Sequence, residues 1–302
     1  MTASEQGPVD YRLRRKLDAG EWILSVELDP PHGLSAEDGV AAAEALREAG
    51  VDCVDVGDSP MASVRMSPLA FAAEVQRRTR VEAIVHFAAR DRNLMALQSD
   101  LLGGHMQGIR SVIALSGDPP ALGRYANATG VWDVKAEGLI ELIATLNSGV
   151  DSAGHALGGE AAFTIAAAAN PGASDLDTEL ARLGEKARRG ADVFFTQPSY
   201  ELEVVERFLE RAEAIGRPVI LGVMPLVSGR NARYMAENVP GVTVPPTVVE
   251  AMERAGDGAA ELGLEMAYEF VQAVRGWSAG VYVIPLLGRI AGVVELVRQV
   301  RQ

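Results

Sequence analysis

The chain has 302 residues, a length that suits a single α/β barrel domain. Hydrophobic residues make up 48%, enough for a sizeable core, and aliphatic side chains must build most of it because aromatic residues are only 5%. The formal net charge of −13 argues against nucleic acid as a partner, since phosphate binding needs clustered Lys and Arg. The single cysteine, Cys53, excludes an internal disulfide and fits a reducing compartment.

Nothing in the sequence predicts insertion into a membrane. No apolar run reaches the ~20 residues that a spanning helix needs. The first residues carry charges with no apolar stretch behind them, so we expect no signal peptide. We therefore expect a cytoplasmic protein, either a monomer or a homo-oligomer, with a small-molecule substrate.

Eight short apolar runs recur along the chain, and they are mostly continuous rather than alternating. Continuous runs are typical of parallel strands that are covered on both faces. The predicted strands are Trp22–Val26, Val51–Val56, Val81–Phe87, Ser111–Leu115, Phe163–Ala168, Asp192–Thr196, Pro218–Val223 and Gly280–Ile284.

A helical pattern follows each run. Ser35 is the expected N-cap of the first helix, and Gly50, Gly190 and Gly216 stand where helix-ending glycines are expected. The predicted helices are Ser35–Ala49, Pro68–Arg78, Leu94–Leu102, Ala136–Leu146, Leu176–Arg189, Glu201–Ile215, Arg230–Glu237 and Ile290–Val300.

Eight strand–helix units without a domain break predict one (β/α)8 barrel (TIM barrel) of the α/β class over residues 1–302. Residues 1–20 form an N-terminal extension, and residues 244–277 form a helical insertion before the last strand. An open doubly wound sheet is the alternative fold, but no GxGxxG fingerprint follows the first strand.

The active site of an α/β barrel lies at the carboxyl ends of the strands. Glu27 stands there among apolar residues, so its pKa should be raised and it could act as a general acid. The other interpretation is that Glu27 only hydrogen-bonds a neighbouring loop. Asp118 could likewise serve only its turn, and Gln197 only loop backbone, while His86 is a ligand, a phosphate contact or a core histidine.

Other reaction classes lack their signatures. The four histidines are scattered, and HExxH, CxxC and GxSxG are absent, so we predict neither a metal site nor a nucleophilic hydrolase. An aldolase or lyase that works through a Schiff base needs a lysine at a strand end, and none of the eight ends offers one.

The residues at the strand ends resemble the methylenetetrahydrofolate reductase family, especially the reductase module fused to homocysteine methyltransferases. The matching segments read SVELDPP, DSPMASVRMSPLA, HFAARDRNLMALQSDLLG, ALSGDPP, ADVFFTQPSY, PVILGVMPLVSGRNA and GVYVIPLLGR. They run in order from about Trp22 to Arg289. The resemblance implies reduction of 5,10-methylenetetrahydrofolate to 5-methyltetrahydrofolate with NAD(P)H, NADH being favoured.

The resemblance also implies roles for individual residues. Glu27 would protonate the bridging nitrogen of the substrate, so that its five-membered ring opens to an iminium ion. Asp118 would hydrogen-bond the pterin and share in catalysis, Gln197 would be a second pterin contact, and Arg289 would face the acidic tail. The implied cofactor-binding residues are Asp58, His86, Gly117, Ala136, Asn170 and Lys186.

Several positions depart from the flavin-binding members of the family. Ser116 stands where an Arg is usual, Asn170 replaces a Tyr, no His follows it, and an aromatic is missing near Gly229. Two mechanisms stay open, one in which FAD carries hydride to the folate and one in which the nicotinamide delivers it directly, and the sequence leans to the second. A folate-binding module without redox activity, serving a methyltransferase partner, is the alternative function.

Overall fold

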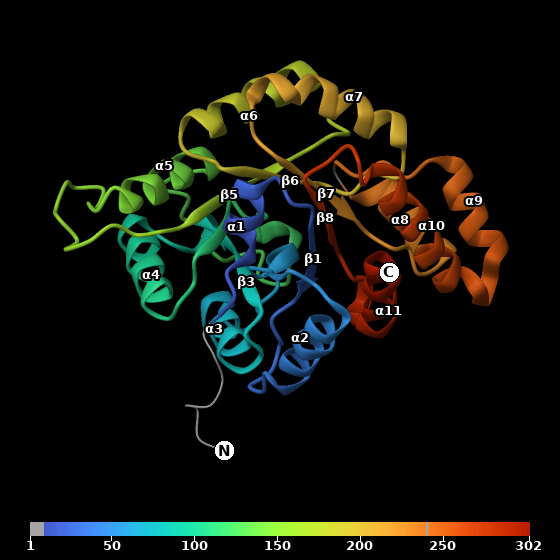
Figure 1. Cartoon of the computed structure of the whole chain (residues 1–302), viewed down its shortest axis with the longest axis horizontal. Coiled ribbons are helices and arrows are strands. Elements are labelled where there is room, and N and C mark those ends of the chain that lie inside the picture. The colour runs from blue at the N-terminus through green and yellow to red at the C-terminus, as the bar shows by residue number, and fades with distance from the viewer. Residues whose placement is uncertain (1–8, 240) are drawn as a thin grey trace.

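The computed structural model describes residues 9–239 and 241–302 and consists of a closed barrel of parallel strands (Figure 1). Each strand pairs with the strands that precede and follow it in the chain, and β8 pairs with β1, which confirms the predicted fold. The strands are β1 Ile23–Leu28, β2 Cys53–Val56, β3 Glu82–Ala88, β4 Ser111–Leu115, β5 Thr164–Ala169, β6 Val193–Thr196, β7 Val219–Val223 and β8 Gly280–Val283.

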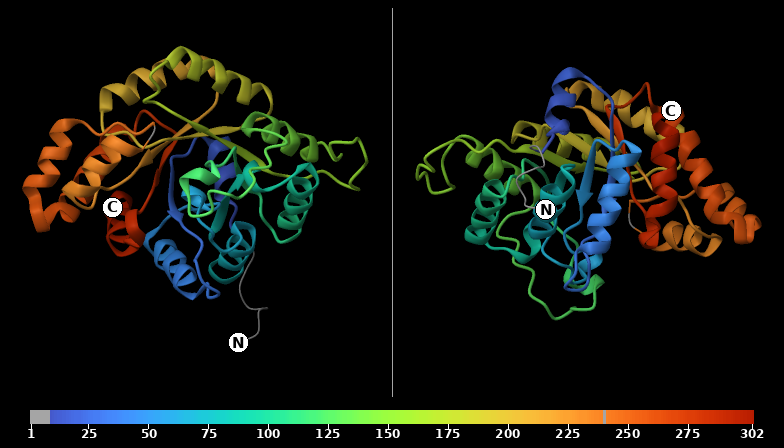
Figure 2. Two further views of the ribbon diagram at one scale, coloured as in Figure 1. Left: turned by 180° about the vertical axis from the view of Figure 1, so that it is seen from behind. Right: turned by 60° about the horizontal axis from the view of Figure 1, so that its bottom comes forward.

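Helices cover the outside of the barrel (Figures 1 and 2). The helices between and after the strands are α2 Glu37–Ala49, α3 Pro68–Thr79, α4 Leu94–Met106, α5 Ala136–Asn147, α6 Leu176–Arg188, α7 Leu202–Ala212, α8 Gly229–Asn238, α9 Pro246–Ala255, α10 Ala259–Val274 and α11 Ile290–Arg301. The expected glycines end their helices with φ of 102° at Gly50, 117° at Gly190 and 68° at Gly216. The N-cap of α2 is Ala36, although the Ser35 hydroxyl accepts a hydrogen bond from the Glu37 N–H at 3.2 Å.

Alternate residues of each strand face the helices or the barrel interior. Val26, Val54 and Val85 belong to the large cluster under the helices, whereas Ile84 and Ile220 belong to a separate cluster inside the barrel. Both faces are therefore largely apolar, which explains why most of the strands show no clear alternation in the sequence.

The N-terminal extension contains a helix that the sequence analysis did not predict, α1 Arg12–Ala19. The Leu13 N–H donates to Glu82 at the start of β3, and Lys16 and Arg14 pair with Asp52 and Asp192, which precede β2 and β6. Leu13 itself is fully buried in the interior cluster. Helix α1 thus closes the amino end of the barrel, opposite the loops that follow β2 and β4 (Figure 2, right).

The insertion before β8 folds as α9 and α10, joined by the short 3-10 helix Gly256–Gly258. It packs beside α8 and extends the barrel on one side (Figure 1). A Cβ on Gly263 of α10 would lie 1.9 Å from the Leu226 carbonyl oxygen, so this close approach to the loop after β7 requires glycine.

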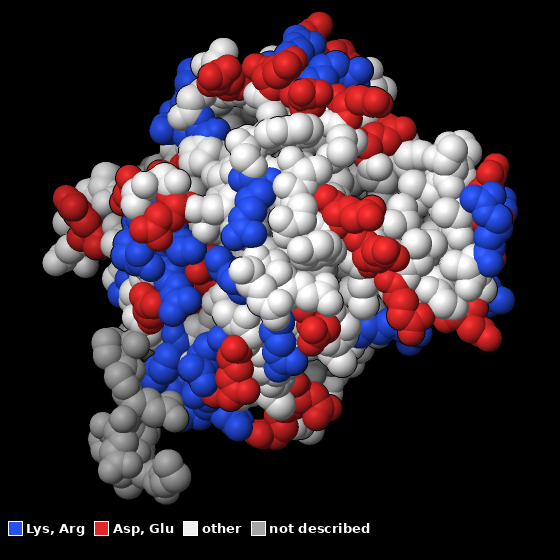
Figure 3. Space-filling view, turned by 45° about the vertical axis from the view of Figure 1, so that its right-hand side comes forward, with Lys and Arg blue, Asp and Glu red and all other residues white. Residues whose placement is uncertain are grey.

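No helix among the described residues is both long and apolar enough to cross a bilayer. On the face shown in Figure 3, acidic and basic side chains surround a broad uncharged area rather than forming one basic patch.

The closure of the barrel by α1 predicts a large effect at Leu13. Leu13→Ala should lower the free energy of unfolding by about 2–5 kcal/mol, because the side chain is fully buried and its loss leaves a cavity. Urea unfolding followed by circular dichroism measures this. The control is Leu34→Ala, since Leu34 is fully exposed and should change stability by less than about 0.5 kcal/mol. Equal effects of the two changes would contradict the role given to α1.

Candidate functional site

The strand register determines which inward side chains are neighbours. The paired Cα positions can be followed from residue 27 on β1 across β2 to β8 and back to β1. This path returns to β1 at the level of position 19, eight residues before its starting point, and this offset is the shear of the barrel. With this shear, inward side chains lie in layers of four that alternate strands contribute.

A layer toward the carboxyl ends contains Glu27 from β1 and His86 from β3, with Ala168 from β5 and Gly222 from β7. The last two are small, so Glu27 and His86 are the only titratable side chains in this layer. Gly222 cannot be larger, because a Cβ there would lie 2.5 Å from the Thr196 carbonyl oxygen.

Glu27 is positioned to hold a proton at neutral pH. Burial raises its pKa to about 8, and the carboxylates of Asp29 and Asp55 add to the shift. Burial lowers the pKa of His86 to about 4, so this imidazole is neutral at physiological pH. Its Nε2 has no hydrogen-bond partner among the described residues.

The next layer inward contains a second carboxyl group, Asp55 on β2, with Tyr282 on β8 and the apolar Ile113 and Phe195. Burial raises the pKa of Asp55 to about 7 despite the nearby Ser25 hydroxyl, which lowers it. Asp55 is not among the site residues predicted from the sequence. The signal was present, because Cys53, Asp55 and Gly57 alternate with the apolar Val54 and Val56.

Hydrogen bonds to Asp118 connect the loops that follow β2, β3 and β4. Its carboxylate accepts a hydrogen bond from the Met61 N–H at 2.8 Å, and its backbone oxygen accepts one from Arg90 at 3.1 Å. Gly117 has φ of +83°, and a Cβ there would lie 2.9 Å from the Arg90 Cβ. Asp118 thus stabilises its loop through hydrogen bonds, in line with one of the two interpretations of the sequence. Its side chain remains partly exposed at the mouth of the barrel.

The loop after β2 is strained. Ser59, Met61 and Ala62 have φ between 47° and 53°, the left-handed region that non-glycine residues rarely adopt. The bond from Met61 to Asp118 is one of the contacts that hold this conformation. Such strain is often found at functional sites.

Asp58 makes an internal ion pair. Its side chain is 3% exposed, lies 2.6 Å from Arg92 and also accepts the Ala88 N–H at 2.9 Å. The Arg92 guanidinium has a second partner, Asp100, at 2.9 Å. These bonds join the loop after β2 to the end of β3 and to the middle of α4.

The remaining residues predicted to bind a cofactor also have hydrogen-bond partners within the chain. Lys186 on α6 is buried and donates to the Ala168 carbonyl oxygen at 2.6 Å. The Asn170 side-chain oxygen accepts the Gly172 N–H at 3.0 Å. The Ala136 N–H, at the start of α5, donates to the Ser116 hydroxyl at 3.0 Å.

Gln197 and Arg289 are the exposed members of the predicted site. Arg289 lines a largely apolar pocket of about 270 Å³ beside Leu264 and Pro285. A neighbouring pocket of about 220 Å³ is lined by residues that include Tyr200 and Phe270. The first pocket adjoins the carboxyl ends of β7 and β8, and the second adjoins those of β6 and β7.

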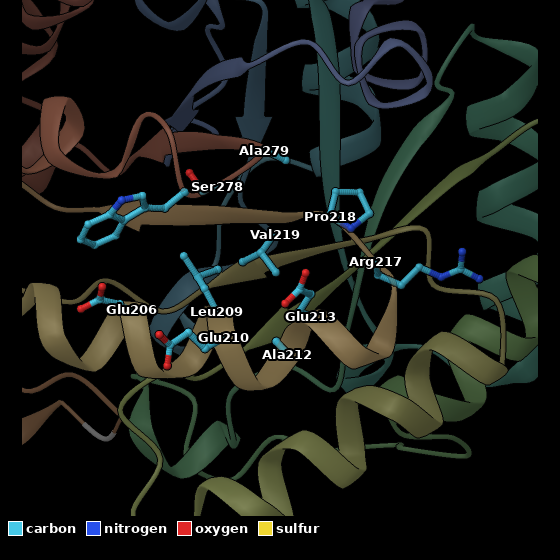
Figure 4. Close-up of a pocket in the computed structure, with 11 residues that line it drawn as sticks. Glu206, Leu209, Glu210, Ala212, Glu213, Arg217, Pro218, Val219, Ser278 and Ala279 are labelled. Atoms are coloured by element: carbon cyan, nitrogen blue, oxygen red, sulfur yellow. The ribbon is translucent and has the colours of Figure 1, made fainter.

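A larger groove of about 430 Å³ lies away from Glu27 and the other residues at the carboxyl ends of the strands (Figure 4). Its lining includes Pro218 and Val219 at the start of β7 and Ala279 just before β8. It therefore opens at the amino ends of these strands, where barrel enzymes do not carry out their chemistry.

A sequence model of the family described as "Methylenetetrahydrofolate reductase" matches residues 12–283. This chain belongs to the methylenetetrahydrofolate reductase family. No cluster of three or more His, Cys, Asp or Glu side chains suited to a metal ion occurs in the described ranges.

Family members in other organisms share limited identity with this chain. A Caenorhabditis elegans protein named "Probable methylenetetrahydrofolate reductase (NADPH)" is 23% identical, over 80% of this chain and 36% of its own length. An Arabidopsis thaliana protein named "Methylenetetrahydrofolate reductase (NADH) 1" is 24% identical, over 74% of this chain and 39% of its own length. The chain thus spans little more than a third of these relatives.

Solved structures outside the family share the fold. A tryptophan synthase from M. tuberculosis has a TM-score of 0.54 at 14% identity, over 97% of both chains. An F420-dependent secondary alcohol dehydrogenase has a TM-score of 0.57 at 11% identity, over 92% of this chain and 98% of the other. At such identities the likeness is evidence of the barrel fold alone.

The internal ion pair of Asp58 predicts a loss of stability on mutation. Asp58→Asn should lower the free energy of unfolding by about 3 kcal/mol, since it removes the buried partner of Arg92. The matched control is Asp100→Asn, which removes the partner that is 44% exposed and should change stability by about 1 kcal/mol or less. Denaturant unfolding of both variants provides the comparison. Unchanged stability in Asp58→Asn would leave cofactor contact as the main role of this residue.

Proposed function

We propose that this chain reduces 5,10-methylenetetrahydrofolate to 5-methyltetrahydrofolate with NADH or NADPH. The observation that carries the proposal is Glu27, a carboxyl group inside the barrel mouth whose pKa is raised to about 8. Membership of the family supports the same reaction. A folate-binding module without redox activity has no use for an acid of this kind.

Glu27 acts as the general acid. At pH 7 most of it is protonated, so it can donate to the bridging nitrogen of the bound folate. The five-membered ring then opens and an iminium ion forms next to the new carboxylate. That carboxylate stabilises the positive charge as it develops, in a site shielded from water.

The other residues bind and orient the substrate. Gln197 and Asp118, at the ends of β6 and β4, contact the pterin. Arg289, exposed beside the apolar pocket at β8, pairs with the acidic tail of the folate. The neutral imidazole of His86 lies in the same layer as Glu27 and leaves the carboxyl group without a cationic partner there.

The residues assigned to a cofactor do not fit FAD well. Hydrogen bonds within the protein already occupy polar groups of Lys186, Asp58 and Asn170. In addition, Asn170 stands where flavin-binding members carry an aromatic side chain. We therefore infer that a dihydronicotinamide, when bound, would supply hydride to the substrate without a flavin between them. Gly117 and His86 are the residues of this chain that would hold that group, since the Ala136 N–H already donates to the Ser116 hydroxyl.

The relatives are named for NADPH in one case and NADH in another, so our preference for NADH stays a prediction. The cytoplasmic location and the choice between monomer and homo-oligomer also stay predictions.

Glu27→Gln should reduce methylenetetrahydrofolate-dependent oxidation of NADH or NADPH by about 10²–10⁴-fold, because the amide cannot protonate the substrate. Binding of the nicotinamide cofactor, measured by fluorescence titration, should stay within twofold of the parent protein. The control is Glu21→Gln, on an exposed glutamate before β1, which should leave turnover unchanged. Full turnover by Glu27→Gln would contradict the proposed acid.

The purified protein should show no visible flavin absorbance and should still turn over with NADH or NADPH. Denaturation followed by chromatography of the supernatant checks for released flavin. Stoichiometric FAD, or activity that depends on added FAD, would contradict direct hydride transfer while leaving the proposed reaction in place.

A further inference from the structure

Asp55 is a buried acid for which the proposed reaction gives no role. It is 0% exposed, and its Cα is paired in register with that of Glu27 on the adjacent strand. Neither of its carboxyl oxygens has a hydrogen-bond partner of ordinary geometry among the described residues, and the same holds for the Ser25 hydroxyl beside it. A carboxylate without partners in such a place is costly, and its structural benefit to the barrel is not evident.

The titratable side chains that face Asp55 from the strands are acidic, or neutral at physiological pH. Glu27 faces it from β1, Tyr282 from β8, and Glu82 and His86 extend inward from β3. Cys53 lies two residues away on its own strand. In the part of the chain that the structure describes, the inward positions of β4, β5, β6 and β7 carry only uncharged side chains. The basic residues of α1 lie at the amino end of the barrel, where Arg14 donates to Thr164, and not beside Asp55.

Two carboxyl groups in an apolar interior without a counter-ion cannot both be ionised at low energy. We propose that Glu27 and Asp55 form one acid pair that holds a single proton near neutral pH, with the charge on Asp55 keeping that proton on Glu27. The proposal rests on the proposed function, because it gives Asp55 its role through the acid that the reaction uses. Asp55 is then a positioning residue, buried one layer below the group that meets the substrate.

Asp29 also acts on Glu27, and its contribution must be separated from that of Asp55. After burial, Asp29 is the larger of the two carboxylate contributions to the raised pKa of Glu27. However, Asp29 is 42% exposed and lies 3.0 Å from Arg65, which neutralises its charge. Water and salt screen an exposed, paired charge, whereas they reach a fully buried one much less.

The test is an infrared titration of the whole protein without substrate. The carbonyl stretch of protonated Glu27 is assigned by its loss in Glu27→Gln, and its midpoint is then followed in Asp55→Asn and Asp29→Asn. In Asp55→Asn we expect Glu27 to lose its proton at least about one pH unit lower, at both low and high salt. In Asp29→Asn we expect a downward shift that shrinks at high salt.

A midpoint for Glu27 that is unchanged or higher in Asp55→Asn would overturn the acid pair. Should Asp55→Asn fail to fold, as judged by circular dichroism, Asp55→Ser provides the same removal of charge with a smaller side chain. Either variant must show the lower midpoint for the proposal to stand.

Kinetics then link the pair to the reaction. The alkaline limb of the kcat/KM profile should move to lower pH in Asp55→Asn by the same amount as the infrared midpoint. An infrared shift without turnover in the parent protein would sink the proposed function and not the pair. Turnover whose alkaline limb stays in place while the infrared midpoint moves would overturn the role of the pair in catalysis.

Discussion

Closure of eight parallel strands into one barrel is the constraint on which the rest of this structure depends. Closure sends every second strand residue into an interior that holds only layers of four side chains, and the register decides which residues share a layer. Glu27 and His86 are neighbours for this reason, although 59 positions separate them in the chain. Their shifted pKa values follow from the apolar residues that fill the remaining places.

Most of the fold could be predicted from the sequence because the strands are buried on both faces. Their continuous apolar runs are unmistakable, and each predicted strand overlaps the observed one. Helix α1 was missed because RLRRKLDA is strongly charged and contains only two leucines. Its helical state comes from contacts with Glu82, Asp52 and Asp192, residues far away in the sequence that periodicity cannot reveal.

The site could be predicted where position along a strand is enough. Glu27 ends a strand among apolar residues, and this placed it at the barrel mouth. Asp55 was overlooked because the alternation of Cys53, Asp55 and Gly57 with two valines is short and lies in a run that is otherwise apolar. The register with β1 then shows that Asp55 is paired with Glu27. The partners of Asp58 and Lys186 could not be predicted either, since such hydrogen bonds depend on how loops fold against one another.

The helix at the amino end of the barrel has a consequence for the opposite end. Leu13 seals the interior from below, and Arg12 and Lys16 neutralise Asp52 at the rim, so bulk water is kept from the floor of the barrel. The low polarity that raises the pKa of Glu27 is therefore maintained in part by a segment of chain at the far end of the barrel. Helix α1 therefore acts as a seal at the amino end, and the pKa of the acids at the carboxyl end depends on how closely α1 packs against the barrel.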